Sequence, residues 1–222
     1  MAAHEVSGGA PGGDPGCARD ASSALVASLL LVFGLEFLVL AVAPLDRHDW
    51  ALENVLVVLT LGVLVGTWRR FRFTSLSYGL IFVFLCLHEV GAHYTYARVP
   101  YDDAFAWLTG STFNELVGWQ RNHFDRLVHF LFGLLLVHPL REWYVRTSGA
   151  VGWWRNGVAV TLVMAGSMLF ELFEWGAAEL FGGDLGVAYL GTQGDVWDAH
   201  KDMFLASLGG ILGLTVFARR PV

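Results

Sequence analysis

The chain is poor in charge and in cysteine, and each scarcity excludes a class of protein. Only 15% of its residues are charged while 55% are hydrophobic, a balance too apolar for a soluble domain. The net charge of −6 is mild and acidic, so we expect no nucleic-acid partner. Two cysteines are too few for a disulfide scaffold, and the chain has no recognisable cofactor motif. The low charge and the high hydrophobic content together favour a protein that crosses a membrane several times.

Six apolar runs predict an all-α, polytopic membrane helix bundle. Crossing a bilayer takes roughly 20 apolar residues. The runs cover about 22–43, 51–68, 76–92, 124–144, 156–180 and 196–217. Residues 1–21 are rich in Gly, Pro and Ala and predict a disordered cytoplasmic tail. The remainder, 22–218, is expected to form a single membrane domain, with an aromatic loop at 94–120 lying on the outer membrane surface.

The positions of the arginines predict the orientation of the bundle. Arginines follow the second and sixth runs and also lie between the fourth and fifth, so a six-span topology places these groups on one side. Basic residues are enriched on the cytoplasmic side of membrane proteins. We therefore expect both the N- and C-termini to be cytoplasmic.

Acidic and histidine side chains gather at the outer ends of four predicted helices. They are His88 and His93, then Asp125 and His129, then Glu171 and Glu174, and finally Asp195, Asp198 and Asp202. Within a helix, residues four apart share a face, as Asp125 and His129 do. Ionisable groups inside a membrane are costly unless they are paired, hydrated or bound to something. The sequence thus predicts a polar site at the extracytoplasmic end of the bundle.

The residue types of this cluster favour a divalent metal. Carboxylates with imidazoles suit Zn, Mn or Fe, and helix bundles with such pairs hold one or two ions. The predicted ligands are His88, His93, Asp125, His129, Glu171, Asp198 and Asp202. Arg121 and Arg126, with Tyr94 and Tyr96, are expected to bind substrate, and Glu174 or Asp195 to act as general base.

The first hypothesis is a metal-dependent hydrolase acting on a membrane lipid or a lipid-linked envelope substrate. Three alternatives stay open. Arg121 or Arg126 could neutralise Glu171 in an ion-pair network without any metal. The same groups could form a proton or cation relay in a binding or transport protein. Asp125 could simply cap its helix. The sequence does not indicate an oligomeric state.

Four longer motifs carry a resemblance to known families. They are His88-x-x-Gly91-x-His93-Tyr94-Thr95-Tyr96, Arg121-Asn122-His123-x-Asp125-Arg126-x-x-His129-Phe130, Glu171-x-x-Glu174-Trp175 and Gly191-Thr192-Gln193-Gly194-Asp195-x-Trp197-Asp198-x-x-x-Asp202-Met203. Together they resemble the YjdF-like bacterial inner-membrane proteins, and this resemblance implies a multi-pass protein of the bacterial inner (cytoplasmic) membrane. A weaker similarity reaches the VanZ-like family, whose Asp-Lys-x-x-His-Phe pattern would match Asp125–Phe130 with arginine in place of lysine. That similarity implies a role in the cell envelope. One such role is that of a non-enzymatic tolerance factor.

Overall fold

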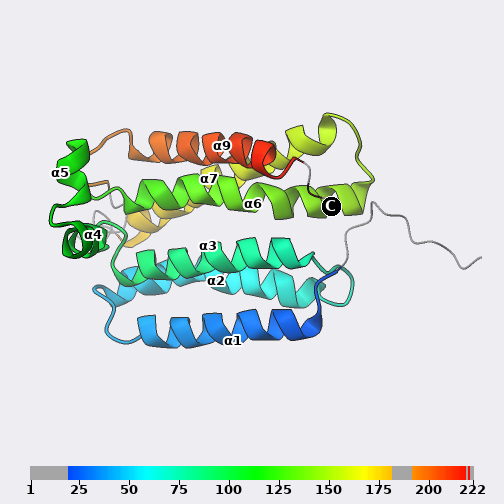
Figure 1. The fold of residues 1–222 in the computed structure, drawn as a ribbon, viewed down its shortest axis with the longest axis horizontal. Helices are drawn as coiled ribbons and strands as arrows, with labels where there is room; N and C mark the ends of the chain where they lie inside the picture. Colours follow the sequence, from blue (N-terminus) through cyan, green and yellow to red (C-terminus); the bar gives the residue numbers. More distant parts are fainter. Residues whose placement is uncertain (1–19, 182–191, 219, 221–222) are drawn as a thin grey trace, which may run out of the picture.

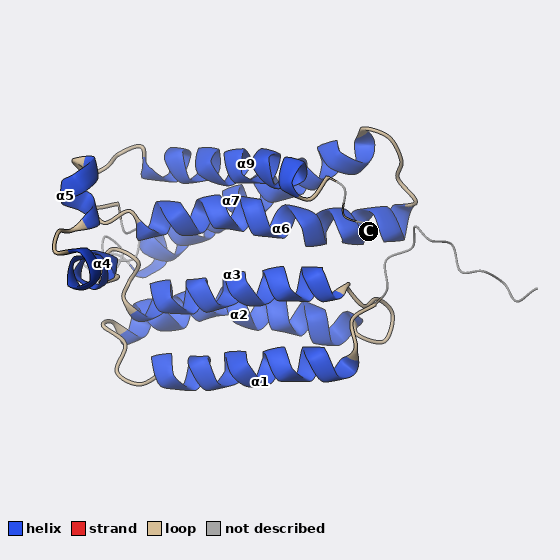
Figure 2. Ribbon diagram, in the orientation of Figure 1, coloured by secondary structure: helices blue, strands red, loops and turns tan. Residues whose placement is uncertain are grey.

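A computed structural model describes residues 20–181, 192–218 and 220, and within these ranges the secondary structure is helical with no strand (Figure 2). The element order is α1 (Ser23–Leu40), α2 (Arg47–Thr67), α3 (Ser75–His93), α4 (Tyr101–Thr109), α5 (Phe113–Val117), α6 (Phe124–Ser148), α7 (Trp154–Phe181) and α9 (Asp198–Val216). The all-helical prediction is confirmed. Most of the expected tail, 1–19, and much of the Gly-rich loop before α9 lie outside the described residues.

Each of the six predicted apolar runs corresponds to one long helix. Four of them, α1, α2, α3 and α7, are long and apolar enough to cross a membrane. Helices α6 and α9 have sufficient length, but polar residues at their ends make them less apolar. The structure therefore supports a polytopic membrane protein. Six spans and cytoplasmic termini stay predictions.

The long helices form two groups. Helices α1 and α2 each pack on α3, while α6, α7 and α9 pack on one another, and α3 joins the groups by packing on α6 (Figure 1). At the arginine-rich end, buried Glu142 of α6 fixes this junction. Its carboxylate accepts hydrogen bonds from the Thr74 backbone N–H at 2.8 Å and from the Thr74 hydroxyl at 2.8 Å, and it pairs with Arg146 at 2.7 Å.

Glycines allow α6 and α9 to approach one another very closely. A Cβ placed on Gly133 of α6 would overlap the carbonyl oxygen of Ala206 on α9, and one on Gly209 would overlap the carbonyl oxygen of Phe130. One turn further, a Cβ on Gly213 would meet the Leu134 carbonyl oxygen at 2.5 Å. Small residues with this spacing bring helix backbones together in membranes, where van der Waals packing replaces the hydrophobic driving force.

The predicted loop at 94–120 contains two short helices. Helices α4 and α5 lie across the end of the bundle (Figure 1). Asn114 Nδ2 donates to the Arg121 carbonyl oxygen at 3.0 Å, which ties α5 to the start of α6. Trp107 is 85% exposed and Leu108 is 73% exposed, as expected for side chains that enter a membrane interface.

The close contact between α6 and α9 generates the first prediction. Gly133→Ala should lower the free energy of unfolding by about 1–3 kcal/mol, because the added methyl group meets backbone that cannot yield. Thermal melting in detergent measures the effect. Gly34→Ala on α1 is the matched control, since its Cβ meets nothing within 4 Å. A Gly133→Ala variant that melts like the wild type would contradict the close packing.

Candidate functional site

Three aspartates converge where α6 and α9 begin, at the end of the bundle covered by α4 and α5. Asp125, Asp198 and Asp202 each offer one carboxylate oxygen, and the three oxygens lie within 4.8 Å of one another. Asp198 is 4% exposed and Asp202 is 2% exposed. The spacing of four residues puts Asp198 and Asp202 on one face of α9, and the glycine contact brings that face against α6. We call these three residues the aspartate cluster.

His129 extends the aspartate cluster towards α7. Its Nε2 atom lies 3.6 Å from Asp125 Oδ1 and 3.5 Å from Glu171 Oε1. Glu174 is less than one turn further along α7, and Glu53, Glu171, Asp125 and Asp202 are its acidic neighbours. Carboxylates from α6 and α7 thus flank the His129 imidazole.

The arginines of the site lie at its rim, where they bind aspartates of α9 and of the segment before it. Arg121 holds Asp198 with two hydrogen bonds, of 2.7 Å and 3.2 Å. Arg126 contacts Asp195 at 2.5 Å and Asp198 at 3.1 Å. Lys201 also contacts Asp195, at 2.5 Å. Both Asp195 and Asp198 are therefore paired with cationic side chains.

The deeper acids lack such partners. Across the described ranges, no arginine or lysine nitrogen comes within 4.0 Å of Asp125, Glu171 or Asp202. Asp202 Oδ1 and Glu171 Oε1 are buried and have no hydrogen-bond partner among the residues described. Buried carboxylates without a counter-charge cannot all be ionised in a low-dielectric place. They require protons or a bound cation.

A hydrogen-bonded loop holds the rim in position. The Asn122 backbone N–H donates to Gln193 Oε1, and Gln193 Nε2 donates back to the Asn122 carbonyl oxygen, both at 3.0 Å. Asn122 Nδ2 donates to the Val99 carbonyl oxygen, and the Phe124 N–H donates to Asn122 Oδ1 at the start of α6. These bonds link the loop before α9 to the loop before α6, so Arg121 and Asp198 meet in a fixed geometry.

The Asp195 carboxylate binds two cationic side chains, Lys201 and Arg126. The hydrogen bond from Lys201, the Trp197 backbone N–H and the hydrogen bond from Arg126 hold the pKa of its carboxyl well below the ordinary aspartate value of 3.8. A carboxylate held so strongly in its ionised form is a poor general base near neutral pH. Glu174 lies among other acidic side chains and is therefore the better candidate of the two expected general bases.

His88 and Tyr96 lie beside His129, but they are hydrogen-bonded to one another. The His88 ring contacts the Glu53 carbonyl oxygen through Nε2 at 3.1 Å and the Tyr96 hydroxyl through Nδ1 at 2.5 Å. A carbonyl oxygen only accepts, so Nε2 carries the proton and Tyr96 donates to Nδ1. Both ring nitrogens are engaged, and the arrangement orients Tyr96 instead of offering a ligand atom.

His93 and Tyr94 are not drawn into the aspartate cluster. His93 Nδ1 donates to the Leu40 carbonyl oxygen at 2.7 Å, and the Tyr94 ring packs edge-on against the imidazole. His93 therefore fastens the end of α3 to the end of α1. The sequence pattern could not predict this contact. Residues four apart share one face of a helix, but the spacing does not indicate which neighbouring helix that face meets.

Glu53 of α2 also lies at the site, although it was not among the predicted ligands. It is 2% exposed, its Oε2 has no hydrogen-bond partner in the described part of the chain, and Asp125 and Glu171 are among its charged neighbours. A signal existed in the sequence, because Asp49 and Glu53 are four residues apart at the start of the second apolar run. The same spacing identified the pairs on α6 and α9.

Below the acids the site becomes apolar. A cavity of about 130 Å³ lies between the two helix groups, and His88, Tyr96 and His129 line its polar end. The rest of its lining is mostly apolar and comes from Leu56, Phe84, Val128, Phe132, Gly166, Ser167 and Phe170. The site therefore combines a charged rim, a buried acidic layer and an apolar floor.

The fold and the site define a multi-pass helical membrane protein with an acidic centre buried between its helices. The chain belongs to the family described as predicted membrane protein (DUF2238), whose model matches residues 25–221. It is similar to the inner membrane protein YjdF of Escherichia coli (strain K12), with 36% identity over 201 residues, covering 89% of this chain and 88% of that protein. No solved structure matches the chain. The YjdF-like resemblance and an inner-membrane location are confirmed, whereas the VanZ-like similarity finds no support in these matches.

The rim pairs generate a prediction about acid stability. Asp195→Asn should lower the melting temperature at neutral pH, because it removes the carboxylate that Lys201 and Arg126 hold. A carboxyl whose folded pKa is depressed stabilises the fold above its unfolded pKa and loses that contribution as pH falls. The difference between variant and wild type should thus be constant from pH 7 to 5 and smaller at pH 3.

Thermal melts at these three pH values check the effect. Asp103→Asn, at an exposed position on α4, is the control and should leave the profile unchanged. A gap between wild type and Asp195→Asn that widens towards pH 3 would show that the Asp195 pairs do not form.

Proposed function

We propose that this membrane protein holds a divalent metal ion at the aspartate cluster and uses it in a hydrolytic reaction on a lipid or lipid-linked envelope substrate. One observation carries the proposal. The rim arginines are engaged by Asp195 and Asp198, so the deeper carboxylates of Asp125, Glu171 and Asp202 lack a positive partner among the described side chains. A bound cation would offset their repulsion in this low-dielectric place.

The donor set fits a hard or borderline divalent cation. Asp125, Asp198 and Asp202 present oxygens close enough together to share an ion, and His129 and Glu171 stand next to them as further ligands. Carboxylates with imidazole suit Zn, Mn or Fe, and the number of acids suits one ion or two. Such an ion supplies Lewis-acid polarisation of a phosphoryl or carbonyl oxygen and lowers the pKa of bound water.

The surrounding residues have roles that follow from their positions. Arg121 and Arg126 stand at the entrance and could hold a substrate phosphate with their remaining N–H groups, while Asp195 and Lys201 keep the rim in place. Glu174, set among other acids, is the proposed general base. Tyr96, oriented by His88, presents its ring to the cavity below.

An amphipathic substrate suits the shape of the site. The charged rim would face a polar or phosphorylated group, and the apolar cavity would receive a hydrocarbon segment.

A proton or cation relay is the second candidate. It is favoured by the buried acids of α2 and α3, since Glu53 and Glu89 continue the acidic layer away from the aspartate cluster. A conducting path would have to continue across the membrane. The cavity beneath His129 instead has a mostly apolar lining, which supports a closed site at one end.

Glu171→Gln separates a metal ligand from a simple counter-charge. We expect the variant to lose bound metal after purification, because an amide keeps the shape of the carboxylate but is a neutral and weaker ligand. Its melting temperature should match that of metal-stripped wild-type protein, since removing the ligand costs no more than removing the ion. Elemental analysis and thermal melting in the same detergent measure both quantities.

Glu89→Gln is the matched control. Glu89 is a fully buried carboxyl on α3, but its neighbours are Glu36, Trp50 and Asn54, so the change should leave the metal in place. If Glu171→Gln retains the wild-type metal content, or if the wild type carries none after purification without chelators, the metal proposal is wrong.

A further inference from the structure

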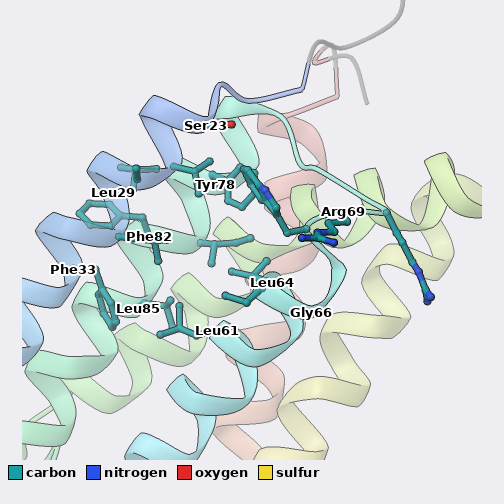
Figure 3. Close-up of a pocket in the computed structure, with 17 residues that line it drawn as sticks. Ser23, Leu29, Phe33, Leu61, Leu64, Gly66, Arg69, Tyr78, Phe82 and Leu85 are labelled. Atoms are coloured by element: carbon teal, nitrogen blue, oxygen red, sulfur yellow. The ribbon is translucent and has the colours of Figure 1, made fainter.

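A second cavity lies at the opposite, arginine-rich end of the molecule. It is about 760 Å³ in volume and opens between α1, α2 and α3, because α1 and α2 both pack on α3 and leave a groove between themselves (Figure 3). Its walls are mostly apolar and include Leu29 and Phe33 of α1, Leu61 and Leu64 of α2, and Phe82 and Leu85 of α3. No residue of the aspartate cluster lines it.

The mouth of the groove is positively charged. Arg69 and Arg70 line it, both are exposed, and neither forms an ion pair with any residue that the structure describes. Nearby arginines are engaged differently, since Arg146 pairs with Asp20 and Glu142. Arg72 lies over the Trp68 ring, with its guanidinium carbon 4.3 Å from the ring centroid. Ser23 adds a hydroxyl at the same end, as Figure 3 shows.

The geometry points to an anionic phospholipid as the occupant, and we propose that this groove binds one such lipid. An acyl chain would fill the apolar interior between α1 and α2, where water would be costly. The phosphate would lie between the guanidinium groups of Arg69 and Arg70, which can each donate several hydrogen bonds to it. Basic pockets between membrane helices bind anionic headgroups by this combination of charge and apolar depth. The lipid would also add contacts between α1 and α2, which touch one another through the rings of Phe37 and Trp50.

Two variants test the two halves of the site. Arg69→Gln with Arg70→Gln removes the charge at the mouth, and Gly66→Leu places a side chain in the groove, where a Cβ on Gly66 meets nothing within 4 Å. Their matched controls are Arg155→Gln, an arginine of α7 away from the groove, and Gly62→Leu, one turn earlier on α2 and outside the lining. Melting temperatures verify that each variant folds.

Native mass spectrometry in detergent with added phosphatidylglycerol or phosphatidylcholine measures binding. We expect one phosphatidylglycerol per wild-type monomer and an affinity roughly 30-fold lower in the double arginine variant. Phosphatidylcholine should bind weakly and equally to both proteins. Gly66→Leu should lose the bound phosphatidylglycerol, and the two controls should keep it.

Three results would overturn the proposal. One is equal affinity of the wild type for the two lipids. Another is unchanged phosphatidylglycerol binding in both the double arginine variant and Gly66→Leu. The third is a wild-type dimer that Gly66→Leu dissociates, because the groove would then hold a second copy of the chain in place of a lipid.

Discussion

The close approach of α6 and α9 is the constraint on which the site depends. Gly133, Gly209 and Gly213 let the two backbones touch, and their N-terminal ends therefore meet with Asp125 on one helix and Asp198 and Asp202 on the other. A larger residue at any of these glycines would separate the helices. The acidic centre is thus a consequence of backbone packing several turns away from it.

This packing brings several carboxylates close together, and the cationic side chains at the rim neutralise only some of them. Arg121, Arg126 and Lys201 neutralise Asp195 and Asp198. Asp202 and Glu171 lie deeper, and the described cations do not reach them. Burying unpaired carboxylates costs several kcal/mol each, so such groups persist where they hold something or exchange protons. That cost is the physical basis for placing function here.

The sequence predicted the helices well because each apolar run is long enough to leave one interpretation. It also predicted that Asp125, His129, Glu171, Asp198 and Asp202 gather at one end, since helix direction alternates from span to span. It could not decide whether Arg121 and Arg126 neutralise Glu171 or the α9 aspartates, because periodicity gives a face and not a partner. The same limit hid the contact of His93 with α1.

The most direct test of the central claim is anomalous X-ray diffraction from crystals of the wild-type protein grown with divalent zinc or manganese. The account predicts a peak within bonding distance of the Asp125, Asp198 and Asp202 carboxylates, about 2.0–2.2 Å for zinc. A crystal structure with no anomalous peak there, in which these carboxylates bond only to one another, to water or to an arginine, would contradict it.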